Sequence, residues 1–123
     1  MEASAFSWDD TAQDNPIALL TRKVVQGEKM LVAQVKLEKG CHVAYHHHIS
    51  EQISITISGR VHWKVGEPGT DSYFEQVLTG GEVMVLPSNV PHSVDALEDT
   101  FIYDIISPIG PMGVDSQKAV SSA

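Results

Sequence analysis

The residues of this chain best suited to metal chemistry are histidines that alternate along one segment. His46 and His48 are two positions apart, and Gln52 has the same parity four positions further on. In a continuous β-strand, residues of one parity share a face, so these three side chains would converge on one place. His92 follows a proline-rich turn and could join them from a neighbouring strand. Two or three imidazoles with an oxygen donor suit Mn, Fe, Co, Ni or Zn better than Ca or Mg.

The other histidines and the cysteine have simpler interpretations. His47 has the opposite parity to its neighbours, His42 precedes them, and His62 lies on the polar side of its segment. We expect these three on the surface or in packing contacts, and we expect the single cysteine, Cys41, to be structural. The run of three histidines could also be a polar surface stretch, but its place between strand-like segments argues against an added tag.

Alternation of apolar and polar residues accounts for most of the chain. No window has the period of a helix, and no unit of ~20–50 residues is repeated. Short strands separated by glycine and proline turns predict an all-β sandwich or barrel. The expected strands are residues 31–37, 43–58, 60–65, 73–78, 83–86 and 101–106.

The chain has the length of one domain, 123 residues. Residues 1–16 are polar and acidic without a clear period, and we expect a flexible N-terminal lead-in there. Residues 17–106 carry the strands of the barrel. Residues 107–123 contain two prolines, two glycines and several serines, and we expect them to form a C-terminal tail.

The composition restricts the partners of the protein. Sixteen acidic residues oppose eight basic ones, which gives a net charge of −8. Such a surface repels phosphate backbones and anionic lipids, so we expect neither a nucleic acid nor a membrane as partner. One cysteine excludes an intramolecular disulfide, and the first ten residues lack the pattern of a signal peptide. We therefore expect a cytoplasmic protein that binds a small molecule.

The spacing of glycines, prolines and histidines resembles the two sequence motifs of the cupin superfamily. The resemblance covers roughly residues 28–106, and the two motifs occur in the right order. The first motif is matched by Gly40, His46, His48, Gln52 and Gly59, and the second by Gly81, Pro87, Asn89 and His92.

This resemblance implies a double-stranded β-helix, the jelly-roll cupin barrel, in agreement with the strand pattern. It also implies that the metal ligands are His46, His48, Gln52 and His92. The chain departs from the usual motifs at three positions. Gln52 stands where most cupins have glutamate, Asn89 where they have glycine, and Ala96 where they have asparagine.

The neutral side chain of Gln52 affects the predicted chemistry. Three imidazoles and one amide leave a bound divalent ion with close to its full charge, which makes it a stronger Lewis acid. A ligand set with a carboxylate is instead typical of many non-haem iron oxygenases. The sequence therefore favours isomerase, lyase or ring-opening tautomerase chemistry on a small oxygenated substrate.

Among small single-domain cupins, the chain most resembles those that open unsaturated uronate rings in pectin and alginate degradation. The shared stretches are residues 50–52, 57–60, 87–92 and 103–104. In that group an aspartate on the last strand transfers protons, and Asp104 occupies the matching place. Asp104 could equally be a strand-end residue with a surface hydrogen bond. The arginine that follows the aspartate in that group has no counterpart in the tail, so its carboxylate clamp is missing.

The strand parity also predicts the two faces of residues 52–57. Ser54 and Thr56 share the parity of Gln52 and should face the interior, where hydroxyls suit a sugar-like ligand. Ile53, Ile55 and Ile57 should then face outward. Because such a row is costly in water, we expect a terminal segment or a second subunit to cover it, and we expect a homodimer.

Three functions remain open from the sequence. The first is the metal-dependent enzyme with Asp104 as the proton-transferring residue. The second is a metal-dependent dioxygenase, which would differ in requiring oxygen. The third is a non-catalytic cupin that binds a small molecule or sugar in the same barrel, because one fold can carry many functions.

Overall fold

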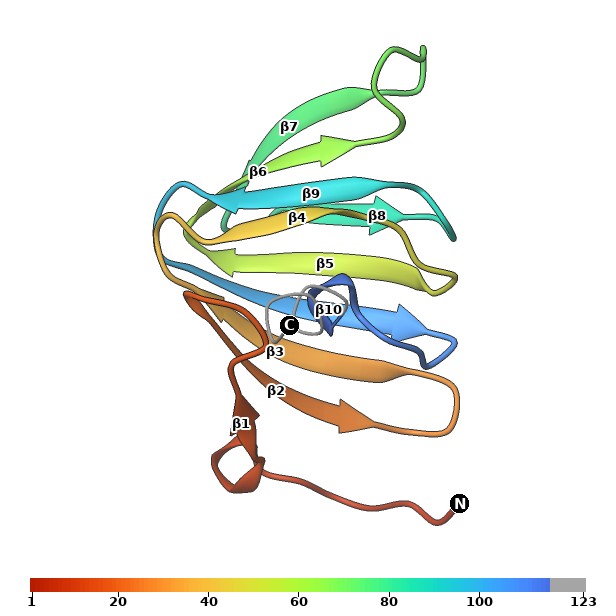
Figure 1. Ribbon diagram of the computed structural model, residues 1–123. Coiled ribbons are helices and arrows are strands. Elements are labelled where there is room, and N and C mark those ends of the chain that lie inside the picture. Colours follow the sequence, from red (N-terminus) through yellow and green to blue (C-terminus); the bar gives the residue numbers. More distant parts are fainter. Residues whose placement is uncertain (116–123) are drawn as a thin grey trace.

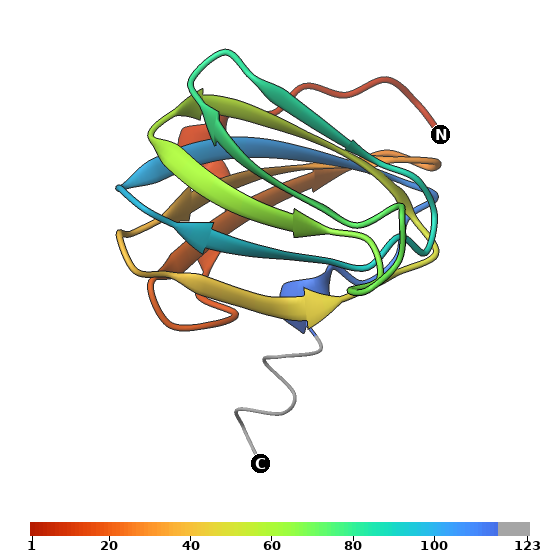
Figure 2. The same cartoon turned by 90° about the horizontal axis from the view of Figure 1, so that it is seen from above.

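The alternation of apolar and polar residues is realised as two antiparallel sheets that face each other (Figures 1 and 2). The computed structural model describes residues 1–115. Its elements are η1 (Trp8–Asp10), β1 (Gln13–Asp14), β2 (Leu20–Gln26), β3 (Leu31–Leu37), β4 (His42–His46), β5 (Glu51–Ser58), β6 (Arg60–Val65), β7 (Phe74–Thr79), β8 (Val83–Leu86), β9 (His92–Ala96) and β10 (Thr100–Ser107). The six-stranded sheet has the order β1-β2-β3-β10-β5-β8, and the four-stranded sheet β4-β9-β6-β7.

The core lies between the two sheets. Every second residue of β10 is buried, so that Ile102 and Ile106 face the opposite sheet. Val61 and Trp63 of β6 face them with almost no exposed surface. Each such side chain contributes roughly 1.5–3 kcal/mol when it is removed from water, which makes this layer the main source of stability. The predicted all-β jelly roll is confirmed.

Several predicted strands end within a residue or two of the observed ones, among them β3, β6 and β8. β9 escapes the sequence analysis because its five residues, HSVDA, show little apolar alternation. Within the predicted lead-in, β1 pairs with β2 through Gln13 and Asp14. Residues 107–115 of the predicted tail are described, and residues 116–123 lie outside the described part of the chain. No helix within residues 1–115 is long and apolar enough to cross a membrane.

The prediction of one strand over residues 43–58 is wrong. The chain leaves β4 at His46, bends through residues 47–50 and enters β5 at Glu51. The physical reason is that β4 belongs to the four-stranded sheet and β5 to the six-stranded sheet, so the backbone must cross between layers. The shared parity of residues 46, 48 and 52 therefore does not result from one continuous strand.

The outer face of β5 is only partly covered. As predicted, Ser54 and Thr56 are buried, while Ile53 and Ile55 are half-buried and Ile57 is exposed. The N-terminal segment covers part of the same sheet, because the Trp8 ring lies 6.0 Å from the Tyr103 ring. Val83 and Val85 of the edge strand β8 remain 49% and 56% exposed.

The homodimer stays a prediction, and light scattering at micromolar concentration can test it. We expect a mass near twice 13.4 kDa, because pairing would remove Ile57, Val83 and Val85 from water. Val85→Lys should shift the protein to the monomer, since a charge in an apolar interface is unfavourable. If the unmodified protein is a monomer, the prediction of a homodimer is wrong.

Gly59 and Gly69 form a matched pair for testing the crossing between sheets. Gly59 lies between β5 and β6 with φ +97°, and a Cβ there would collide with the backbone of Asp99 and Thr100. Gly69 has φ +85° and open space around it. We expect Gly69→Ala to cost about 1 kcal/mol of unfolding free energy from backbone conformation alone. Gly59→Ala should cost about 2–4 kcal/mol, because overpacking adds to it. Urea unfolding measures both, and equal losses would contradict this account.

Candidate metal centre

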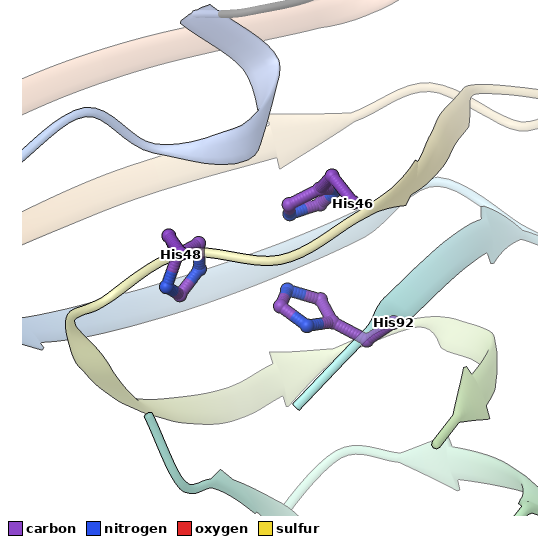
Figure 3. Close-up of side chains that lie close together, drawn as sticks. All are labelled: His46, His48 and His92. Atoms are coloured by element: carbon purple, nitrogen blue, oxygen red, sulfur yellow. The ribbon is translucent and has the colours of Figure 1, made fainter. Parts of the chain in front are cut away.

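Three histidines from two neighbouring segments point at one place (Figure 3). His46 ends β4, His48 lies in the following loop and His92 begins β9. His46 and His92 are directly paired across the two strands. One ligand nitrogen from each ring lies within 4.8 Å of the others, so small side-chain movements bring all three onto one ion.

Backbone contacts determine which nitrogen of each ring is free. In each histidine Nδ1 lies near a backbone carbonyl oxygen two residues away, at 2.7 Å for His46, 2.8 Å for His48 and 2.9 Å for His92. A carbonyl oxygen only accepts, so Nδ1 must carry the proton and donate it. In the neutral ring this leaves the Nε2 lone pair free, which is the usual arrangement of metal-binding histidines.

Burial favours the uncharged form of two of these rings. It lowers the pKa of His46, and it lowers the pKa of His92 to about 4. Hydrogen bonds to backbone carbonyls oppose the shift, and the neighbouring histidines add to it. Both imidazoles are therefore neutral at pH 7, the form that a metal ion requires.

Gln52 completes the group from the opposite sheet. Its Oε1 lies 3.0 Å from Nε2 of His48. Since Nδ1 of His48 already donates to a carbonyl, a neutral His48 would place two lone pairs against each other at this contact. A cation between Nε2 and Oε1 removes the repulsion. The four donors thus fit a divalent transition metal, although their role as ligands stays a prediction.

Asp104 lies beside this group rather than within it. It sits on β10 directly opposite Ser54 of β5, and its Oδ1 accepts a hydrogen bond of 3.2 Å from Nε2 of Gln52. Burial raises the pKa of Asp104 to about 6, although hydrogen bonding to the carboxylate opposes the rise. The sequence left open a surface position for Asp104, and the structure places the residue in the interior, 8% exposed.

The turn before His92 has an unusual backbone. Asn89, which replaces the usual cupin glycine, has φ +63°. Asparagine tolerates this left-handed conformation better than most residues. The Asn89 N–H donates to the carbonyl of His48 at 2.8 Å. The turn therefore ties the two histidine-bearing segments together, and the departure from the motif does not disturb the site.

The cavity beside the histidines contains residues that the sequence analysis did not single out. Arg22, Trp63, Met112 and Gly113 line it together with His46, His92, Gln52, Ser54 and Asp104. Most of the remaining lining is aliphatic, so the interior is less polar than we expected. Arg22 could have been found from the sequence, because it shares the parity of the buried Leu20 on β2.

The residues predicted to lie outside the site do so. His47 is exposed. His42 pairs with Asp95 at 2.6 Å, and His62 with Glu75 at 2.9 Å, both at the outside of the four-stranded sheet. Cys41 is a buried free cysteine in the core.

The sequence profile of the cupin domain matches residues 33–105, so the chain belongs to the cupin family. No curated protein matches the sequence significantly.

Solved structures share the fold. KdgF from Halomonas sp. is 22% identical with a TM-score of 0.78, over 89% of this chain and 96% of that one. An RmlC-like cupin from Shewanella frigidimarina is 22% identical with a TM-score of 0.76, over 89% and 93%. Bacillus subtilis oxalate decarboxylase, described with Mn(II) centres, is 19% identical with a TM-score of 0.76, over 87% of this chain and 30% of that one. Identities this low show the fold alone.

The triple histidine run supplies its own control for metal binding. We expect the purified protein to bind one divalent transition ion per chain. His46→Ala and His92→Ala should each weaken binding at least about 100-fold, since even partners of ligands contribute about 10–100-fold. His47→Ala should leave binding unchanged, because His47 is exposed. Elemental analysis and metal titration measure this, and equal effects at positions 46 and 47 would exclude the proposed ligand set.

Proposed function

We propose that this cupin is a metal-dependent enzyme of the isomerase, lyase or ring-opening tautomerase type. The observation that carries the proposal is that a buried carboxyl, Asp104, lines one cavity together with His46 and His92, two of the three clustered histidines. The sequence resemblance to uronate ring-opening cupins supports a small uronate-like substrate.

The proposed ligands favour this chemistry over oxygen activation. His46, His48, His92 and Gln52 are all uncharged donors, so they do not neutralise the ion that they hold. A divalent metal held there would polarise a carbonyl or hydroxyl oxygen of the substrate. Mn, Fe, Co, Ni and Zn all accept such donors. The Mn(II) centres described for Bacillus subtilis oxalate decarboxylase support a metal of this group.

The chain's own residues would hold the substrate and move its proton. Asp104 faces the cavity and would take or return a proton at a substrate carbon or oxygen. The indole Nε1 of Trp63 is buried and has no hydrogen-bond partner within residues 1–115. Trp63 lines the same cavity, and this N–H would donate to a substrate oxygen that came within reach of it. The aliphatic lining would exclude water from the reaction.

Two other functions use the same site and are separated by experiment. A metal-dependent dioxygenase would require oxygen for turnover. A non-catalytic cupin would bind metal and ligand without converting the ligand. The uncharged donors weigh against the first, and the interior position of Asp104 weighs against the second.

We expect the metal-loaded protein to convert unsaturated uronates equally under air and under nitrogen. At saturating metal, Asp104→Asn should lower kcat at least about 100-fold with metal retained, because general acid–base catalysis contributes that much. His46→Ala should lose metal and turnover together. Tyr103→Phe is the control, because the neighbouring Tyr103 packs against Trp8 on the outer face of β10. It should leave kcat unchanged.

The same assay distinguishes the alternatives. Turnover that needs oxygen would replace the proposal with a dioxygenase. Ligand binding without turnover across uronates, hydroxy-ketones and phenolics would indicate a binding protein. Activity that survives both Asp104→Asn and His46→Ala would contradict an enzyme built on this site.

A further inference from the structure

The segment that follows β10 closes the end of the barrel next to the histidines. The Ser50 hydroxyl donates to the Pro108 carbonyl at 2.6 Å, which holds the start of the segment against the loop before β5. Met112 and Val114 are buried. Met112 and Gly113 line both the interior cavity and an outer groove that His47 and His48 border. Residues 108–115, which we call the strap, therefore lie between the interior cavity, which His46 and His92 line, and the outer groove, which His48 lines.

The strap lies directly on one proposed ligand. A Cβ at Gly113 would collide with the His46 ring, including its Nε2 edge. Figure 3 shows the ribbon of this part of the chain passing near His46. In this position the backbone of Gly113 occupies space beside Nε2 that an incoming ligand would need. Access to the interior cavity from the outer groove therefore requires the strap to move.

A buried ion pair holds the strap in place. Arg22 donates to Asp115 of the strap at 2.9 Å, and to Asp14 of β1 at 2.8 and 3.1 Å. The same guanidinium contacts the Met112 sulfur at 3.5 Å, and Asp115 also accepts from the Met112 N–H at 2.9 Å. The Arg22 side chain is 8% exposed, whereas Asp115 is 34% exposed. Burial alone would lower the pKa of Arg22, but the hydrogen bonds and opposite charges of the two aspartates outweigh this effect and raise the pKa above its usual value.

Arg22 is also the only lysine or arginine that lines the cavity within residues 1–115. A guanidinium pairs with a carboxylate through two parallel hydrogen bonds. Asp14 already provides such a pair, and Asp115 adds a single contact from a segment that has to move. When the strap leaves, Arg22 loses one anionic partner at a buried position, which is unfavourable unless another anion replaces it.

We propose that Asp115 is an internal carboxylate that keeps the strap closed, and that a small carboxylate ligand opens the site by replacing it on Arg22. Arg22 then serves as a specificity-determining residue that selects anionic ligands. This rests on the proposed function only in assuming that ligands enter the cavity beside the histidines. The proposal places carboxylate recognition at Arg22 on β2. The tail, where the uronate ring-opening cupins have an arginine, contains none.

The two aspartates provide a matched test, with malonate as the probe and calorimetry on the metal-loaded protein. Asp115→Asn should bind malonate about fivefold more tightly, because the competing internal carboxylate is removed. Asp14→Asn removes a partner of the same guanidinium but leaves the strap held, so it should not tighten binding. Arg22→Lys should weaken binding about tenfold, since a lysine cannot make the paired contacts. The uncharged malonamide should bind the unmodified protein and the three variants with the same affinity.

Hydrogen exchange provides a second measurement that does not depend on the metal. Malonate should speed exchange at the amides of residues 112–114 in the unmodified protein, with or without metal. Equal malonate affinities for Asp115→Asn and Asp14→Asn, or unchanged exchange, would overturn the proposal. A purified protein that binds no metal would instead contradict the proposed function, while the exchange result would still decide the role of the strap.

Discussion

The proposed metal site depends on one constraint: three imidazoles must present Nε2 to the same point while remaining neutral. Each ring meets part of this requirement locally, because its Nδ1 proton is held by a carbonyl two residues away. Neutrality comes from burial, which lowers the pKa of His46 and His92. The barrel supplies what no local contact can, namely a largely apolar interior with both histidine-bearing segments at the same end.

The loops in which the chain crosses from one sheet to the other bring the histidines together. Residues 47–50 carry the backbone from one sheet to the other, and His48 projects from this loop between His46 and Gln52. Asn89 makes the second segment turn sharply and bonds to the His48 carbonyl. Two non-glycine residues within residues 1–115 have a positive φ: Asn89, which lies where the motif residues meet, and Leu19, which lies directly before β2. The strain at Asn89 is of the kind that proteins retain at a site.

Local patterns predict much of this protein, and long-range contacts account for what they miss. Alternation is enough to place β3 and β6, and motif spacing is enough to bring His92 to His46. The sequence does not reveal the break in the strand at residues 47–50, because the alternation of residues continues unchanged through the loop between the two sheets. The contact of Gly113 with His46 has no local signal, because it joins distant segments. The parity of Arg22 predicts that its side chain is buried. Its partners cannot be predicted in this way, because they come from both ends of the chain.

The carboxyl at position 104 accounts for the presence of an amide, rather than a carboxyl, at position 52. Oε1 of Gln52 faces His48, while its Nε2 donates to Asp104. A glutamate at position 52 would instead bring two carboxylates together in a buried place, and one of them would have to hold a proton or be expelled. The amide avoids this repulsion because one end accepts and the other donates. A cupin with an inward-facing carboxyl at position 104 therefore favours an uncharged donor at position 52, and the departure of Gln52 from the usual glutamate follows from the same electrostatics that place Asp104 beside the site.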